Sequence, residues 1–266
     1  MRRLFALLLT LLLALLLAGC GNGFYKIPKE EYRQRVQTLG VLPLMYDNGS
    51  TISRGDREDV VTLLRRHNAG KEIRLVNMLR EEKAYFDIRS VAGDPEQFFS
   101  SLVTGATMRG QGDQAYRSYR FDPQAVRQIA DRNLVDGILV VILNGVTRTE
   151  TRRDRALLSY LEAPYNSILV TAAVVAPTGE IVWEYPGREA FLPLQYPDFD
   201  EAYYNKSDAV KIKEITLPGL DRALTESGKG IFNRSSFPNL YQTLFDKLVG
   251  ELKPGMLNML KGKQPS

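Results

Sequence analysis

Six consecutive apolar residues, 138–143, constrain the fold of this chain more than any other stretch. Successive side chains of a strand point to opposite faces, so a run without polar residues must be covered on both faces. Just before it, Asp122 and Pro123 predict the N-cap and first residue of a helix. Asp136-Gly137 then leads directly into the apolar run. This order predicts an α/β fold with residues 138–143 near the centre of the sheet.

A second apolar strand, predicted at residues 168–176, forms one half of a hairpin. Pro177-Thr178-Gly179 predicts a tight turn after it, and the return strand is expected to end near residue 185. Beyond Pro238, apolar residues recur at helical spacing and predict a C-terminal amphipathic helix. We therefore expect an α/β fold: a mixed sheet with central strands 138–143 and 168–176, a 168–185 β-hairpin and flanking helices.

The remaining elements follow from weaker patterns. Residues 40–46 predict a strand, and Asp56 predicts the N-cap of the helix that follows. Residues 104–121 are rich in Gly, Arg, Gln and Tyr without a period, which indicates an exposed loop. The polar run at residues 147–155 indicates exposed strand ends and a loop, and residues 207–215 indicate a short helix.

The N-terminal segment has the pattern of an export signal. Arg2 and Arg3 precede a 15-residue run, 4–18, which is apolar apart from one Thr. Such a run suits a signal-peptide core and is shorter than the roughly 20 residues that span a bilayer. Leu17-Ala18-Gly19-Cys20 resembles the lipobox of bacterial lipoproteins. The resemblance implies cleavage before Cys20, a diacylglycerol on its thiol and an N-acyl chain such as palmitate; the alternative is an ordinary secretory signal in which Cys20 is incidental.

The chain divides accordingly. We expect a signal peptide at residues 1–19, a tether at 20–37, a single α/β domain at 38–255 with an irregular insertion at 186–235, and a tail at 256–266. Removal of the signal leaves 247 residues and lowers the net charge from +4 to +2, which gives no reason to expect nucleic-acid binding. Because the only cysteine would carry lipid, no disulfide can form, and the fold depends on its hydrophobic core.

Three core and turn segments resemble a known group of envelope lipoproteins. They are Gly40-Val-Leu-Pro-Leu, Asn133-Leu-Val-Asp-Gly-Ile-Leu-Val-Val and Val174-Val-Ala-Pro-Thr-Gly-Glu-Ile-Val-Trp, and they anchor residues 39–185. The group has a TolB-N-terminal-like α/β domain and includes CsgG and LpoB. The resemblance implies a fold more than an activity.

The sequence lacks the residue combinations typical of an enzyme. His67 is the only histidine, and its place at a helix end beside two arginines is explained by the helix dipole. One histidine and a lipidated Cys20 are too few ligands for zinc, and no phosphate-binding glycine loop occurs. Asp198, Asp200 and Glu201 lack the spacing of a calcium loop. We expect a non-enzymatic protein whose only bound group is the lipid on Cys20.

An aromatic and acidic segment inside residues 186–235 is the best candidate contact surface. Tyrosines give large amphipathic contact areas, and carboxylates suit a basic partner; the simpler interpretation is that these rings cover the sheet. The arginines of residues 148–155 suit lipid phosphates or an acidic protein, although a solvated strand end is again simpler. The candidate partner-contact residues are Tyr196, Asp198, Phe199, Asp200, Tyr203 and Tyr204.

Together these observations predict a non-enzymatic lipoprotein that is anchored in the outer membrane, faces the periplasm and binds an envelope protein. Such a protein would support assembly, transport or cell-wall synthesis. Gly21, rather than Asp, follows the cysteine, which favours the outer membrane in enterobacterial-type sorting. The competing hypothesis is a lipid-tethered periplasmic hydrolase or small-ligand-binding protein that uses residues 186–235 as a lid. The sequence leaves the partner's identity and homo-oligomer formation open.

Overall fold

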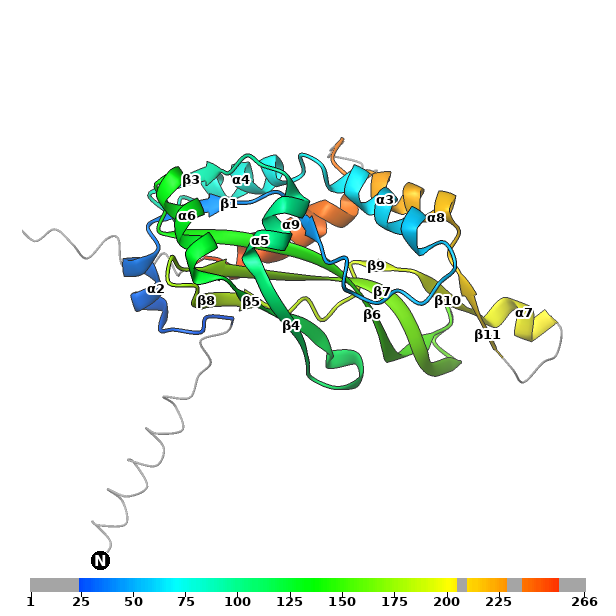
Figure 1. The fold of residues 1–266 in the computed structure, drawn as a ribbon. Coiled ribbons are helices and arrows are strands. Elements are labelled where there is room, and N and C mark those ends of the chain that lie inside the picture. The colour runs from blue at the N-terminus through cyan, green and yellow to red at the C-terminus, as the bar shows by residue number, and fades with distance from the viewer. Residues whose placement is uncertain (1–23, 205–209, 229–235, 254–266) are drawn as a thin grey trace, which may run out of the picture.

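A computed structural model describes residues 24–204, 210–228 and 236–253 of the chain (Figure 1). The predicted signal peptide, the lipobox with Cys20 and the predicted tail at 256–266 lie outside the described residues. A mixed sheet forms the middle layer, with strand order β3-β1-β6-β7-β8; β2 also pairs with β6, and β9 with β7. The strands of this sheet are β1 (Thr38–Val41), β2 (Met45–Tyr46), β3 (Asp87–Ser90), β6 (Gly137–Arg153), β7 (Tyr160–Val175), β8 (Ile181–Tyr185) and β9 (Leu192–Pro193).

The predicted fold class is confirmed. β1 runs parallel to β3 and β6, whereas β6–β7 and β7–β8 are antiparallel. Residues 138–143 lie in β6 at the middle of the strand order, and all six are buried because helices cover both faces of the sheet there. The 168–185 hairpin is present, and Gly179 adopts a φ of 82° in its turn, which a side chain would disfavour.

Four helices cover one face of the sheet. Their apolar side chains and those of β1, β6, β7 and β8 form the larger core, in which Trp183, Tyr241 and Phe245 are fully buried. The C-terminal amphipathic helix is among them, as predicted. These helices are α3 (Arg57–Asn68), α4 (Glu72–Glu81), α8 (Leu217–Thr225) and α9 (Asn239–Glu251).

The opposite face is covered by two helices and a separate hairpin. α5 (Pro95–Leu102) and α6 (Pro123–Asn133) pack there beside β4 (Val103–Arg109) and β5 (Tyr116–Phe121), which are joined through the short helix η1 (Gly112–Gln114). The expectation of an exposed loop at residues 104–121 is wrong for the strands β4 and β5, whereas residues 110–114 between them are exposed. Tyr119 and Phe121, on one face of β5, belong to the core that α5 and α6 cover, and Tyr116, on the other face, belongs to a smaller cluster with Val146 and Leu169. These buried rings stabilise a strand whose other residues are polar.

The described part of the predicted tether is packed onto the domain. α2 (Lys29–Arg35) places Tyr32 in the core, and Tyr25 forms a β-bridge to Trp183 in β8. The backbone of Phe24 accepts a hydrogen bond from Glu184, and Lys26 donates one to Val182. The assignment of residues 24–37 to a tether is therefore wrong, because this segment covers the otherwise unpaired edge of β8.

Two local predictions near β1 also differ from the structure. The strand expected at residues 40–46 is divided into β1 and β2, with Pro43 between them, since proline has no N–H to donate to a ladder. Asp56 stands at the N-cap of α3, but its carboxylate makes no capping hydrogen bond and pairs with Arg54 instead.

Beyond the layers, β6 and β7 continue as a two-stranded ribbon. Their register runs unbroken from Ile138 opposite Val175 to Arg153 opposite Tyr160. The prediction of exposed strand ends is confirmed at Arg153 and Arg155 and is wrong at Arg148, which is buried and lies 2.9 Å from Glu150. Paired charges allow a polar sequence to form a long strand here.

A short arm projects from the same end of the molecule (Figure 1). It consists of β10 (Gln195–Asp198), α7 (Phe199–Tyr204) and β11 (Lys211–Glu214), and β10 pairs antiparallel with β11. The helix predicted around 207–215 is wrong at residues 211–214, which are in a strand, and residues 207–209 lie outside the described residues. Alternation of lysine with Ile212 and Glu214 suits a two-stranded hairpin better than a helix.

Candidate partner-binding surface

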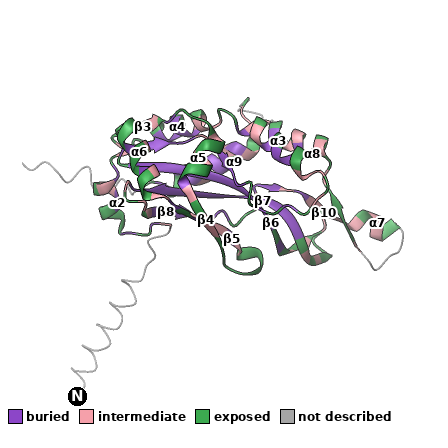
Figure 2. Ribbon diagram, in the orientation of Figure 1, coloured by how far each residue is buried: buried purple, intermediate pink, exposed green. Residues whose placement is uncertain are grey.

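All six predicted contact residues lie on the arm. Tyr196 and Asp198 are in β10, and the other four form most of α7. The interpretation that these rings cover the sheet is wrong for the two tyrosines at the end of α7, because Tyr203 is 79% exposed and Tyr204 is 80% exposed. Their rings contact each other edge to face at 5.4 Å. Figure 2 shows α7 as half-buried or exposed along its length.

Two arginines attach the base of the arm to the domain. The guanidinium of Arg54 is almost fully buried and donates to the carbonyl of Ile215 at 3.2 Å, just after β11. Arg152, in the β6–β7 ribbon, donates to the carbonyl of Gln195 at the start of β10. Each cation donates to a backbone carbonyl at one end of the arm, so the arm leaves the domain at a defined position.

The acidic residues of the arm are mostly neutralised within it. Lys213 lies 2.8 Å from Asp198 and also contacts Glu201, which in turn lies 2.8 Å from Lys211. Hydrogen bonds from Lys213 lower the pKa of Asp198, and those from Lys211 and Lys213 lower the pKa of Glu201. Among the described residues, Asp200 has no ion-pair partner, so it alone of the predicted acids is free for a basic group.

A groove of about 690 Å³ separates the arm from the end of the ribbon. Its arm side includes five of the six predicted contact residues, all except Tyr204. Its ribbon side includes Arg153, Arg155 and Tyr160. The groove therefore has aromatic walls, with positive groups on the ribbon and the free carboxylate of Asp200 on the arm.

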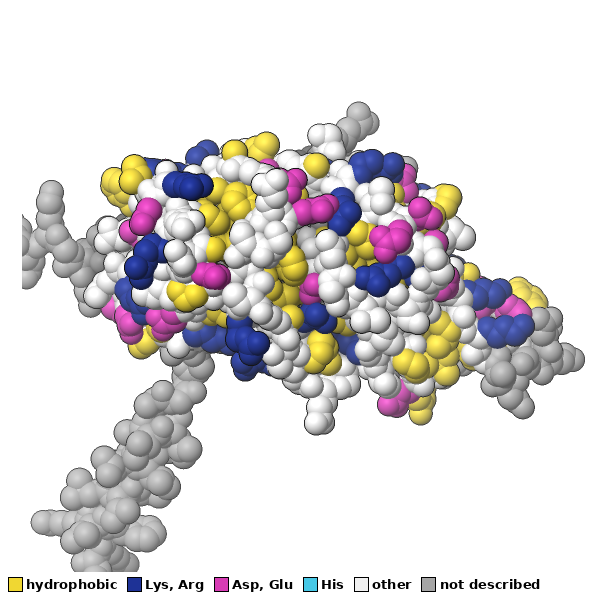
Figure 3. Space-filling view, viewed as in Figure 1, with side chains coloured by type: hydrophobic (Ala, Val, Ile, Leu, Met, Phe, Trp, Pro, Cys, Tyr) yellow, Lys and Arg dark blue, Asp and Glu magenta, His cyan; other side chains and the backbone are white. Residues whose placement is uncertain are grey.

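Exposed apolar side chains concentrate around this groove. Seven of the eleven large hydrophobic residues that are exposed in the described chain belong to the ribbon end or the arm, and Figure 3 shows hydrophobic side chains on both. They are Leu157, Leu158, Tyr160, Tyr196, Tyr203, Tyr204 and Ile212. Such a concentration is typical of an interaction surface.

The sequence analysis missed the leucines and Tyr160 on the ribbon side of this surface. These residues precede the arm by about 40 positions, and only the antiparallel pairing of β6 with β7 brings them beside it. The apolar run from Ala156 to Leu158, directly after a stretch of polar residues, is the signal in the sequence that could have identified them.

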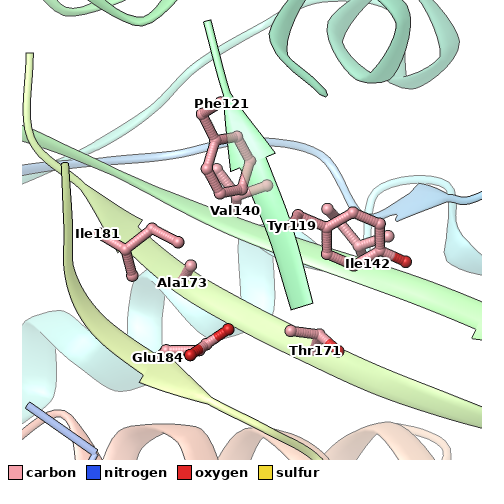
Figure 4. A pocket seen from close by; sticks show the side chains of 8 residues that line it. All are labelled: Tyr119, Phe121, Val140, Ile142, Thr171, Ala173, Ile181 and Glu184. Atoms are coloured by element: carbon pink, nitrogen blue, oxygen red, sulfur yellow. The ribbon is translucent and has the colours of Figure 1, made fainter. Parts of the chain in front are cut away.

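Other features of the described chain have structural explanations. His67 lies 2.8 Å from Asp221 and links α3 to α8, and its hydrogen bond lowers the pKa of that carboxyl. A space beneath β5, lined by Tyr119, Thr171 and Glu184 among others, is too small for a water molecule (Figure 4).

Within the described residues, no group of three His, Cys, Asp or Glu side chains is placed to hold a metal ion. Nor does that part of the chain contain a helix with the length and apolar character needed to cross a membrane.

Comparisons with known proteins do not assign a family. No protein-family model matches the chain, and no curated protein matches it. A solved structure of a neuraminyllactose-binding hemagglutinin homologue from Helicobacter pylori covers 82% of this chain and 86% of its own, with 8% identity and a TM-score of 0.37. At that identity and score, the likeness indicates neither a shared family nor a shared function.

Proposed function

We propose that this chain is a lipid-anchored, non-enzymatic protein of the bacterial envelope that binds a protein partner through the arm. The observation that carries the proposal is the pair Tyr203 and Tyr204, exposed on the helix of an arm whose base is held to the domain by hydrogen bonds from Arg54 and Arg152. Rigid, exposed tyrosines contribute contact area at low entropic cost and are frequent at the centres of protein interfaces. The lipobox supports attachment through Cys20 at the outer membrane, facing the periplasm.

Confinement to a membrane raises the effective concentration of a binder for partners on the same surface. We therefore expect Cys20→Ser to leave the fold unchanged and to remove membrane attachment together with most of the activity in cells. Mass spectrometry of the N-terminal peptide tests the lipid directly. An unmodified Cys20 in the mature protein would contradict the anchor without bearing on the arm.

Photo-crosslinking in intact cells tests the arm. A photoreactive amino acid at position 203 or 204 should capture one defined protein, and reciprocal capture from that protein should recover this chain. Position 73 is the matched control, because Ile73 is also apolar and exposed but lies on α4, away from the arm. Capture of the same proteins from position 73, or no dependence on Tyr203→Ala and Tyr204→Ala, would contradict the proposal.

A small-ligand-binding protein remains the second candidate because of the groove. Its volume of about 690 Å³ falls within the roughly 300–1,000 Å³ typical of ligand sites. In that case the arm would act as a lid, and a ligand should raise the unfolding temperature of the wild type but not of Tyr196→Ala. The openness of the groove to solvent and the exposure of Tyr204, which does not line it, favour a protein partner.

A further inference from the structure

The turn at the end of the β6–β7 ribbon, residues 153–160, is built to expose two leucines. Leu157 is 67% exposed and Leu158 is 87% exposed. The carboxylate of Asp154 accepts a hydrogen bond from the Leu158 N–H at 2.9 Å, and the Asp154 carbonyl accepts one from the Leu157 N–H. The turn is thus fixed by hydrogen bonds while its apolar side chains remain in solvent.

Leu157 adds a conformational cost to this exposure. Its φ of 60° lies in the left-handed region, and this backbone conformation is less favourable for a residue with a side chain than for glycine. Burial inside the protein does not offset that cost, because the side chain is mostly exposed. Folding alone therefore gives no reason for a leucine at this position.

Basic and aromatic side chains flank the two leucines. Arg153 and Arg155 are exposed, and the guanidinium of Arg153 lies 5.7 Å from the ring centre of Tyr160 on the facing strand. Arginines beside an apolar turn are complementary to a lipid bilayer with anionic headgroups, which is negatively charged at its surface and apolar beneath. Tyrosine is frequent at the boundary between the headgroups and the acyl chains. Asp154 opposes this match only in part, because its single negative charge stands in the sequence between the positive charges of Arg153 and Arg155.

The ribbon also points to the side on which the described chain begins. In Figure 1 its far end bends away from α3, α4, α8 and α9, toward the lower side, and the start of the described chain also lies on that side. Phe24 lies four positions after Cys20, so their Cα atoms are at most about 14 Å apart. An anchor at Cys20 would hold this side of the protein next to the membrane.

From these observations we propose that the ribbon turn is a second membrane contact. Leu157 and Leu158 enter the outer part of a lipid layer, and Arg153 and Arg155 bind anionic phospholipid headgroups beside them. The orientation of the domain relative to the membrane rests on the proposed lipid anchor at Cys20. Insertion of the turn does not depend on that anchor. Two contacts at separate points would fix the domain's orientation and hold the arm close to the membrane surface.

The test uses the full chain with Cys20→Ser, reconstituted into vesicles, so that a lipid on Cys20 plays no part. An environment-sensitive fluorophore is attached at Leu158→Cys or, as the control, at Ile73→Cys on the helical face. In vesicles containing phosphatidylglycerol, the probe at 158 should shift to the blue and be quenched by an acyl-chain quencher, and the probe at 73 should not. An aqueous spectrum at 158, or equal quenching at 73, would overturn the proposal.

Two further variants separate insertion from folding. Arg153→Gln with Arg155→Gln should lower insertion into anionic vesicles by about fivefold for each arginine and leave it unchanged in neutral vesicles. Leu157→Gly should lower insertion by about tenfold while it raises stability, because glycine relieves the left-handed strain. Unchanged insertion in both variants would contradict the proposed contact, and reduced stability in Leu157→Gly would contradict the strain argument.

Discussion

The guanidinium of Arg152 stacks on the ring of Tyr165, 4.0 Å from its centroid, and the same side chain donates to the Gln195 carbonyl. Glu150 lies 2.8 Å from it and balances its charge. One arginine therefore joins the two strands of the ribbon to the base of the arm. The position of the candidate partner surface depends on this contact, although the residue itself is not part of that surface.

Replacement of Arg152 tests this role. We expect Arg152→Ala to lower the free energy of unfolding by about 1–3 kcal/mol, because it leaves the Gln195 carbonyl without this donor, removes one of the two arginines that pair with Glu150, and removes the stacking on Tyr165. Hydrogen exchange should accelerate in residues 195–198. The control is Arg153→Ala, which is one position further along and exposed, and should change stability by less than about 0.5 kcal/mol. Equal effects of the two substitutions would refute the assignment.

The N-terminal segment gives a second prediction. Tyr25 is buried and its ring contacts that of Tyr32 edge to face at 4.9 Å. Tyr25→Ala should lower the free energy of unfolding by about 3 kcal/mol, as expected for removal of a buried aromatic ring. Gln34→Ala, at an exposed position of α2, should have little effect. Chemical denaturation measures both, and a Tyr25→Ala protein of unchanged stability would restore the interpretation of this segment as a tether.

The end of α6 offers a stabilising substitution. Leu134 occupies the C-cap with φ 52° and ψ 56°, and it is 72% exposed. Leu134→Gly should raise the free energy of unfolding by about 1 kcal/mol, because glycine adopts this left-handed conformation without strain and little apolar burial is lost. Leu134→Ala keeps the strain and should give no gain. A thermal-unfolding comparison of the three proteins checks the prediction, which a destabilised glycine variant would contradict.

Buried tyrosines predict a loss of stability at alkaline pH. Burial raises the pKa of Tyr32, Tyr119 and Tyr241 above the ordinary value of 10. The unfolded chain then releases these protons at a lower pH than the folded protein does. Their contribution to stability is therefore complete below about pH 10 and falls above it, by about 1.4 kcal/mol per pH unit for each tyrosine.

Urea unfolding at a series of pH values measures this slope. Tyr241→Phe removes one ionisable group, so the decrease in the free energy of unfolding per pH unit above pH 10 should become smaller by the contribution of one tyrosine. The same substitution removes the hydrogen bond from Tyr241 to Asn68, which lowers stability at every pH. Stability that does not depend on pH above 10 would show that the buried tyrosines ionise as readily as those of the unfolded chain.

Much of the architecture was predictable from local patterns. Apolar runs at 138–143 and 168–176 leave no polar face, so they specify strands covered on both sides. Asp94 and Asp122, each followed by proline, accept hydrogen bonds from the first backbone N–H groups of α5 and α6, as their sequences indicate. These signals depend on residues close together in the chain, and no tertiary contact outweighs them.

Predictions were less successful where stability comes from distant residues. The polar β5 forms a strand because Tyr119 reaches the buried carboxylate of Asp47 at 3.0 Å and Ser118 reaches that of Glu184 at 2.5 Å. Arg148 is buried because Glu150 pairs with it on the same strand. The identity of a polar residue does not indicate whether it is buried with a partner or exposed to solvent. Segments that contain such residues are therefore predicted to be loops.

For the candidate surface, the sequence by itself determined the residue types: an arm segment rich in tyrosine and acid, and an apolar triplet that follows a run of arginines. Only the tertiary structure decided that they lie on opposite sides of one groove, that Asp198 is neutralised by Lys213, and that Leu157 and Leu158 remain exposed. The physical reason is that chemical character belongs to single side chains. Proximity, charge pairing and exposure depend on strand register and on packing between residues far apart in the chain.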